Sequence, residues 1–177
     1  ELDRVFAQTH ALILKLVEEG TITGLRVDHV DGLFHPRRYL EKLREKTGGI
    51  PIFVEKILAS DEHPPRSWPI QGTTGYDFLN RVMGLFCNTR NERAMDTVYS
   101  RFIGLSESYD RIEYDAKKLI IDQHMAGDID NLANRMKAVS SSYRHGYDIT
   151  LFHLKEALVE VMARFPVYRT YIGGGDG

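Results

Sequence analysis

The sequence has almost no cysteine, no long apolar run and no excess of either charge. Its one cysteine among 177 residues, Cys87, cannot form a bridge within the chain, and its neighbours in VMGLFC predict a buried, unreactive thiol. With no apolar span of about 20 residues and no signal-peptide pattern, we expect a cytoplasmic protein without membrane contact. A formal net charge of −2 offers no basic stripe to a nucleic acid, so a neutral or weakly charged ligand is favoured.

Motifs for metal and phosphate binding are also missing. The seven histidines are scattered, with no HExxH and no paired spacing, so neither a metal site nor a cofactor is predicted. The segment GTTGYDF has two glycines but lacks the Lys-Ser or Lys-Thr pair of a phosphate loop. It is interpreted instead as a turn that packs against Trp68.

The first 60 residues alternate between helical and strand periodicity. Apolar residues at helical spacing over 2–19 end at Gly20, and a twofold alternation follows over 25–29. Pro36 opens a second helix, and 51–58 is a short apolar run rich in β-branched residues. The order helix, strand, helix, strand predicts parallel strands with crossover helices.

The rest of the chain has helical periodicity almost throughout. A proline- and glycine-rich linker over 61–75 leads to a helical subdomain over 76–177, so the domain boundaries are 1–60, 61–75 and 76–177. The predicted fold is an α/β fragment, predominantly helical, with two parallel strands and an all-α subdomain. Five aromatic residues at helical spacing are expected in the core: Phe78, Phe86, Tyr99, Phe102 and Phe165. Because both ends fall within element-like patterns, we expect a piece of a longer protein.

Two acidic residues interrupt the predicted strands. Asp28 lies two residues after Arg26, and Glu55 lies inside IPIFVEKIL. Burial of an unpaired carboxylate costs several kcal/mol, which a purely structural strand avoids. Two non-catalytic alternatives stay open. In one, Glu55 belongs to an edge strand on which it faces water beside Lys56. In the other, Arg26 and Asp28 form a simple surface ion pair, since residues i and i+2 share a strand face.

Taken together, the two acids favour a catalytic interpretation. Each lies near the carboxyl end of a predicted parallel strand, and successive strands are usually neighbours, so both carboxylates should meet at the edge where α/β active sites form. Glycosyl transfer uses such a pair, one acid attacking the anomeric carbon and the other protonating the departing oxygen. Arg26 favours Asp28 as the anionic nucleophile, whereas apolar surroundings favour Glu55 as the acid.

These motifs carry a family resemblance. GLRVDHVDGLFHPRRYL, IFVEKIL and the W-x-x-x-GTTGYDFLN segment together resemble the maltooligosyltrehalose synthases, which belong to the alpha-amylase family of (β/α)8-barrel glycoside hydrolases. The resemblance extends through most of the chain. It implies that Asp28 is the nucleophile, Arg26 its companion and Glu55 the general acid/base, on part of a barrel followed by an all-α insertion.

The resemblance also implies a reaction: the reducing-end α-1,4 bond of a maltooligosaccharide is remade as an α,α-1,1 bond in trehalose biosynthesis. Four residues close to the motifs are candidates for holding the released glucose: His29, Asp31, Lys56 and Tyr76. The family's third carboxylate follows an Asn-His pair that is not found here, so we expect it, with the remainder of the parent barrel, outside this chain, which should be inactive alone. An α-1,4-glucan hydrolase and a non-catalytic helical interaction module remain as alternatives.

Overall fold

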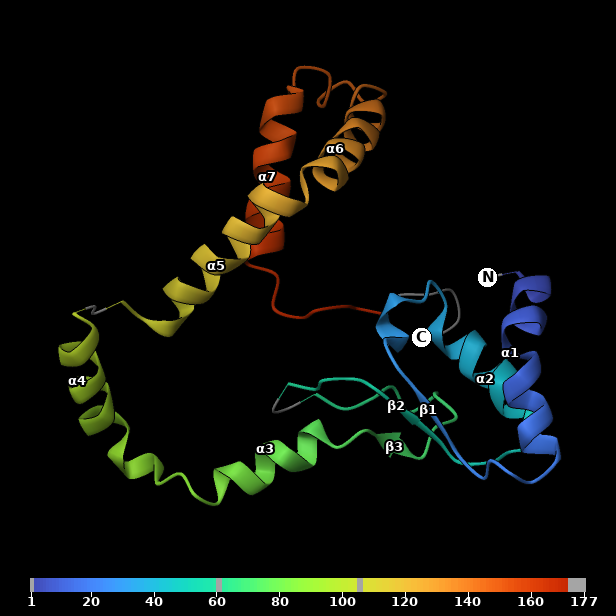
Figure 1. Ribbon diagram of the computed structural model, residues 1–177. Coiled ribbons are helices and arrows are strands. Elements are labelled where there is room, and N and C mark those ends of the chain that lie inside the picture. Colours follow the sequence, from blue (N-terminus) through green and yellow to red (C-terminus); the bar gives the residue numbers. More distant parts are fainter. Residues whose placement is uncertain (1, 60–61, 105–106, 172–177) are drawn as a thin grey trace. The chain divides into compact units, whose positions relative to one another are not determined.

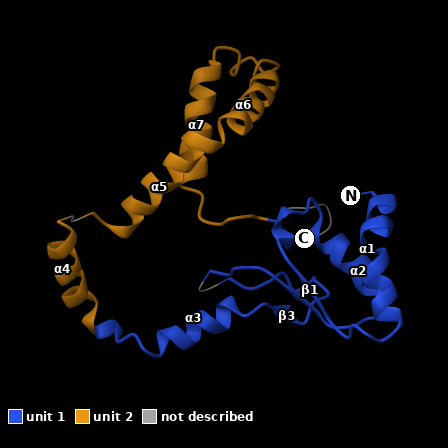
Figure 2. Cartoon of the chain, in the orientation of Figure 1, with its two compact units in different colours: residues 1–90, 171–177 blue, residues 91–170 orange. Residues whose placement is uncertain are grey.

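The computed structural model describes residues 2–59, 62–104 and 107–171. These residues form two compact units, one of residues 1–90 and 171–177 and the other of residues 91–170 (Figure 2). Residues 60–61, at the start of the predicted linker, and the glycine-rich end at 173–177 lie outside the described residues. Within the described part of the chain, no helix is both long enough and apolar enough to span a membrane.

The first unit has the predicted order of helix, strand, helix, strand (Figure 1). Its elements in chain order are α1 (Asp3–Glu18), β1 (Leu25–Val27), a 3-10 turn (Val30–Gly32), α2 (Pro36–Lys46) and β2 (Ile52–Val54). The strands are parallel, with Leu25 opposite Ile52 and Val27 opposite Val54. The sequence prediction of two parallel strands joined by a crossover helix is therefore confirmed, although each strand is shorter than predicted.

A third strand was not predicted. Gly72 and Thr73, the first residues of GTTGYDF, form β3 (Gly72–Thr73), which pairs in parallel with β2 in the sheet order β1-β2-β3. The turn predicted for this motif is thus preceded by a strand, which two residues are too few to reveal through alternation. Gly75 then adopts a φ of 102°, a left-handed conformation suited to glycine, and α3 (Tyr76–Gly84) begins.

The core of the first unit lies between the sheet and α2. Its buried side chains are Val30, Leu40, Leu43, Ile52, Val54 and Trp68. Ile52 and Val54 point into this core while Phe53 between them is 42% exposed, which is the alternation expected of a strand. Full burial of such a side chain contributes about 1.5–3 kcal/mol, so the core fixes the end of β2, where Glu55 follows.

The described residues of the second unit form helices and the segments that connect them, with no strand. The unit contains α4 (Glu92–Ile103), α5 (Tyr109–His124), α6 (Ala126–Ser140) and α7 (Leu151–Ala163). Two of these helices begin with a hydroxyl cap, since Ser108 accepts a hydrogen bond from the Arg111 amide and Thr150 accepts one from the His153 amide. Ile121, Ile129 and Ala163 form a small core among α5, α6 and α7. The fold is thus predominantly helical with a small parallel sheet.

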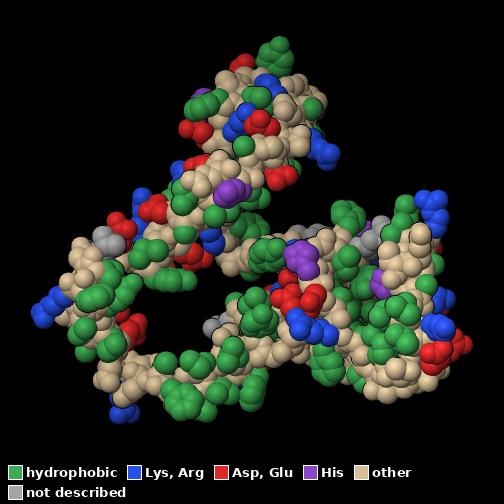
Figure 3. Space-filling view, in the orientation of Figure 1, with side chains coloured by type: hydrophobic (Ala, Val, Ile, Leu, Met, Phe, Trp, Pro, Cys, Tyr) green, Lys and Arg blue, Asp and Glu red, His purple; other side chains and the backbone are tan. Residues whose placement is uncertain are grey.

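Two predictions about the core are wrong. The five aromatic residues expected in the core range from 41% exposed at Phe165 to 87% exposed at Phe102, and Cys87 is exposed as well. Figure 3 shows hydrophobic side chains spread over the surface of α3. Helical spacing identified an apolar face, but spacing does not reveal whether another element covers that face. By its contacts, α3 belongs to the first unit. The predicted domain boundary, with a helical subdomain that starts at residue 76, stays a prediction.

Candidate functional site

The two candidate catalytic acids follow directly from neighbouring strand ends. Asp28 comes after β1 and Glu55 comes after β2. The Glu55 amide donates a hydrogen bond to the Val27 carbonyl at 2.7 Å, so the strand pairing continues up to the acid itself. The structure therefore brings both residues to one edge of the sheet, as the argument from parallel strands predicts.

Arg26 and Asp28 form an ion pair on one face of β1. The Arg26 Nη2 lies 2.8 Å from the Asp28 Oδ1, and the two side chains are 61% and 69% exposed. An exposed pair contributes about 0–1 kcal/mol to stability, which gives the fold little reason to require it. Its clearer effect is to orient the Asp28 carboxylate and to keep a positive charge beside it.

His29 links the two strand ends through its backbone. It has a φ of 52°, a left-handed conformation that costs a non-glycine residue about 1–3 kcal/mol. In this conformation its amide donates to the Glu55 Oε2 at 3.0 Å. Its ring lies against Gly32, where an added Cβ would fall 2.4 Å from the ring atoms Cδ2 and Nε2. The residue after Asp28 thus holds the Glu55 carboxylate.

Beside this edge lies a buried charge cluster. The Lys56 side chain is 2% exposed, and its Nζ lies 2.9 Å from the Glu62 Oε1 and 3.6 Å from the Asp31 Oδ2. The Tyr171 hydroxyl donates to the Asp31 Oδ1, and the Lys56 ammonium lies 5.1 Å from the centre of the Tyr171 ring. Two of the four candidates for holding glucose, Asp31 and Lys56, therefore contact each other.

The contacts within this cluster shift the pKa values of Lys56 and Glu62 in the directions that keep both groups charged. Burial alone would lower the pKa of Lys56, but its contacts with Glu62, Tyr171 and Asp31 outweigh burial and raise that pKa. Burial and the bond to Asp31 raise the pKa of Tyr171 to about 12, whereas Lys56 lowers the pKa of Glu62 against the effect of burial. At neutral pH, Lys56 is a cation, Glu62 an anion and Tyr171 a protonated donor.

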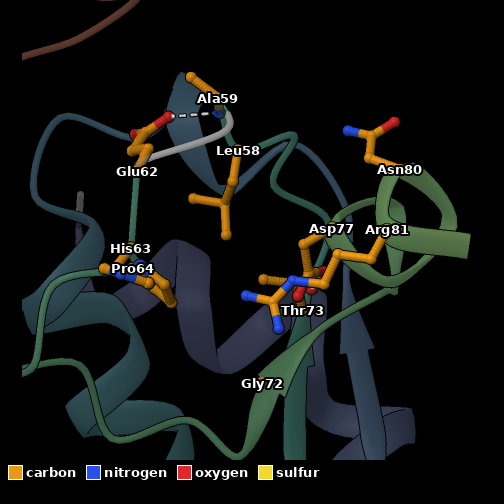
Figure 4. A pocket seen from close by; sticks show the side chains of 10 residues that line it. All are labelled: Leu58, Ala59, Glu62, His63, Pro64, Gly72, Thr73, Asp77, Asn80 and Arg81. Carbon is orange, nitrogen blue, oxygen red and sulfur yellow. Dashed lines mark hydrogen bonds between the residues drawn. The ribbon is translucent and has the colours of Figure 1, made fainter. Parts of the chain in front are cut away.

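A pocket of about 270 Å³, lined by both polar and apolar residues, opens between β3, α3 and the segment after β2 (Figure 4). Its lining residues are Leu58, Ala59, Glu62, His63, Pro64, Gly72, Thr73, Asp77, Asn80 and Arg81. The Thr73 hydroxyl donates to Asp77, which lowers the pKa of that carboxyl. Tyr76, the fourth candidate, is 40% exposed at the start of α3 and does not line the pocket.

Sequence reasoning missed the polar residues of this pocket. Asp77, Asn80 and Arg81 have the i, i+3 and i+4 spacing that places them on one face of α3, and this spacing was the available signal. Among the described residues, no three His, Cys, Asp or Glu side chains are arranged to hold a metal ion. The polar groups of the site are suited to sugar hydroxyls, which need both donors and acceptors.

Comparisons with curated sequences find two relatives, which carry the same name. A scan against protein-family profiles finds no match. Curated proteins of two strains of Mycobacterium tuberculosis, each with the name "Putative maltooligosyl trehalose synthase", are 44% identical to this chain over 89 residues. That match covers 50% of this chain and 12% of each relative, so it is a local match within a much longer protein.

Solved structures extend the likeness over nearly the whole chain. The maltooligosyltrehalose synthase of Arthrobacter ramosus is 33% identical, with a TM-score of 0.78 over 96% of this chain and 21% of its own length. A Sulfolobus tokodaii protein titled as a hypothetical maltooligosyl trehalose synthase is 36% identical, with a TM-score of 0.78 over 99% of this chain and 22% of its own length. The chain thus spans about a fifth of the solved structures that it matches.

Proposed function

This chain is related over nearly all its length to one segment of the maltooligosyltrehalose synthases, and we propose that it is part of a cytoplasmic enzyme that performs their reaction. In that enzyme the segment supplies adjacent strands of a (β/α)8 barrel, with the helical second unit as an insertion. The substrate is a maltooligosaccharide, whose reducing-end α-1,4 bond becomes an α,α-1,1 bond. No cofactor, nucleic acid or membrane takes part.

The observation that carries this proposal is the placement of the two acids. Asp28 and Glu55 follow parallel, hydrogen-bonded strands at one sheet edge, and the His29 amide joins the backbone beside Asp28 to the Glu55 carboxylate. A retaining glycosidase needs two carboxyl groups about 5 Å apart on a single sugar ring. Neighbouring strands at a spacing of about 4.8 Å supply such a separation.

The reaction then follows in two displacements. The Asp28 carboxylate attacks the anomeric carbon of the penultimate glucose, and the bond to the departing oxygen breaks as Glu55 gives that oxygen its proton. The released glucose turns within the closed site. Its anomeric hydroxyl gives its proton back to Glu55 and attacks the same anomeric carbon, which displaces Asp28 and forms the 1,1 bond with retained configuration.

Exclusion of water separates this reaction from hydrolysis. A water molecule in place of the returning glucose would release a shorter maltooligosaccharide, which is the α-1,4-glucan hydrolase alternative. His29, Asp31, Lys56 and Tyr76 are the sequence candidates for holding the glucose. That role stays a prediction, which for Lys56 is tested below against a positioning role. The isolated chain should be inactive, because the family's third carboxylate and the remaining strands are expected elsewhere in the parent protein.

Incubation of the full-length enzyme with maltopentaose tests the proposal. The reducing-sugar signal should fall while the number of glucose units per molecule stays at five, because the product ends in a non-reducing trehalose unit. A rising reducing-sugar signal with shorter products would instead show a hydrolase. The non-catalytic module predicts no change in either quantity, and Asp28→Asn should then make no difference.

A further inference from the structure

We propose that Lys56 is a positioning residue for the two catalytic acids, acting through Asp31 and Glu62 and not through the sugar. This inference rests on the proposed function, because it assigns a task within that site. The ammonium group joins the turn after β1 to the loop after β2. In doing so it keeps the His29 amide at the Glu55 carboxylate.

The direction of the Lys56 side chain is the first argument. The buried and exposed pattern of β2 continues beyond its end, since Val54, Lys56 and Leu58 are buried while Ile57 is 61% exposed. Successive residues of an extended segment point to opposite faces, so Lys56 points toward the core side and Glu55 points away from it. The Lys56 side chain is 2% exposed, so its ammonium group lies among protein atoms and has little access to a sugar.

The charges around Lys56 are the second argument. One ammonium faces two carboxylates whose side chains are themselves poorly exposed, 12% for Asp31 and 32% for Glu62. A sugar hydroxyl would have to displace one of these charged partners to reach the Nζ. A buried ion pair that loses one member leaves an uncompensated charge, which the chain relieves by moving the segment that carries it.

The connection from Asp31 to the acids is short. Asp31 belongs to the 3-10 turn Val30–Gly32, whose N-terminal neighbour is His29 and whose first residue is fully buried. In the segment after β2, the Glu62 Oε2 accepts a hydrogen bond from the Ala59 amide, so Glu62 is tied to the backbone four residues beyond Glu55. A displaced Asp31 therefore carries with it the His29 amide, and Glu55 loses its 3.0 Å hydrogen bond.

The test compares kcat with KM in the full-length enzyme acting on maltopentaose. Lys56→Met should lower kcat by about 100-fold, since a shift of roughly 1 Å at a catalytic group has that cost, while KM stays near the wild-type value. Lys56→Arg should recover part of kcat because it restores the charge. Lys15→Met, at an exposed lysine of α1, is the matched control and should change neither constant.

Two results would overturn the inference: an unchanged kcat in Lys56→Met, or a raised KM with unchanged kcat, which would mean that Lys56 contacts the sugar. If Lys56→Met does not fold, Asp31→Asn decides, because it removes one partner's charge with little change in shape. Asp31→Asn should also lower kcat at constant KM, and a folded variant with wild-type kcat contradicts the inference. Failure of the proposed function is distinguishable, since it shows in the wild-type products.

Discussion

Two backbone hydrogen bonds determine the position of Glu55. Its own amide donates to the Val27 carbonyl at 2.7 Å, and its carboxylate accepts from the His29 amide at 3.0 Å. The second bond depends on the left-handed conformation of His29, whose strain of about 1–3 kcal/mol must be offset by the surrounding structure. Backbone strain beside both candidate acids is typical of a catalytic site.

Substitutions at His29 separate the role of its amide from that of its ring. His29→Gly adopts the left-handed conformation easily and keeps the amide, so kcat in the full-length enzyme should be retained, and KM should rise if the ring holds glucose. His29→Pro removes the donor and fixes φ near about −65°, so kcat should fall about 100-fold. Steady-state kinetics on maltopentaose checks both. An equal loss of kcat in the two variants would rule out a special role for the amide.

The contacts of Glu160 in the second unit lead us to expect that the stability of the fold depends on pH. The Tyr114 hydroxyl, Lys118 and Arg164 all donate to its carboxylate and lower its pKa to about 2, from an ordinary value of 4.5. Folding therefore favours the ionised form. The stabilisation is fully present above about pH 4.5 and is lost as the pH falls toward 2.

Thermal unfolding of wild-type chain and Glu160→Gln at several pH values measures this effect. The wild-type chain should have the higher Tm near about pH 6, and the difference between the two proteins should shrink steadily below about pH 4.5. Glu156→Gln, a neighbouring acid of α7, is the control. A difference that stays constant down to about pH 3 would mean that Glu160 is not held as an anion.

Helices and strands were predictable where their periodicity is long. The sequence predicts α1 through its apolar spacing and its Gly20 stop, and the helix ends at Glu18, two residues before that glycine. It missed β3 because two residues carry no periodicity, and β3 exists only through its pairing with β2. The exposed aromatics of α3 and α4 were misjudged for a related reason, since burial depends on contacts between elements that the spacing within one element does not contain.

The parts of the candidate site that lie at strand ends could be predicted from the sequence, whereas the contacts made by its loops could not. Asp28 and Glu55 could be placed at one sheet edge because parallel pairing follows from the order of elements. The contact of Lys56 with Glu62 could not be foreseen, because it depends on the path of the loop after β2. The pocket residues of α3 share a helix face, but nothing in the sequence indicates what that face meets.

The connection between α6 and α7 provides a test at the level of elements. An added Cβ at Gly146 would lie 2.5 Å from the Ser140 carbonyl oxygen, a backbone atom that cannot move without disturbing the end of α6. Gly146→Ala should therefore destabilise the second unit by about 1–3 kcal/mol. Gly127→Ala is the control, because a Cβ there meets nothing within 4 Å. Denaturant unfolding measures both, and equal stabilities would contradict the packing described here.

On the scale of the whole molecule, the segment that carries the two candidate acids and a helical unit lie in one chain. The first unit, residues 1–90 and 171–177, is interrupted by the second unit, residues 91–170, and Tyr171 contacts Asp31 of the first unit. This return of the chain is the organisation expected of an insertion into a larger domain. The solved relatives are much longer, since this chain covers about a fifth of each.

The central claim is that Asp28 forms a covalent bond to the sugar while Glu55 transfers the proton. A fluorinated glucosyl fluoride slows the breakdown of such an intermediate, so full-length enzyme treated with it can be digested and mapped by mass spectrometry. We expect one added fluoroglucosyl group on Asp28, and none on that position in Asp28→Asn. A label on another carboxylate, with Asp28 unmodified, would contradict the assignment of the nucleophile.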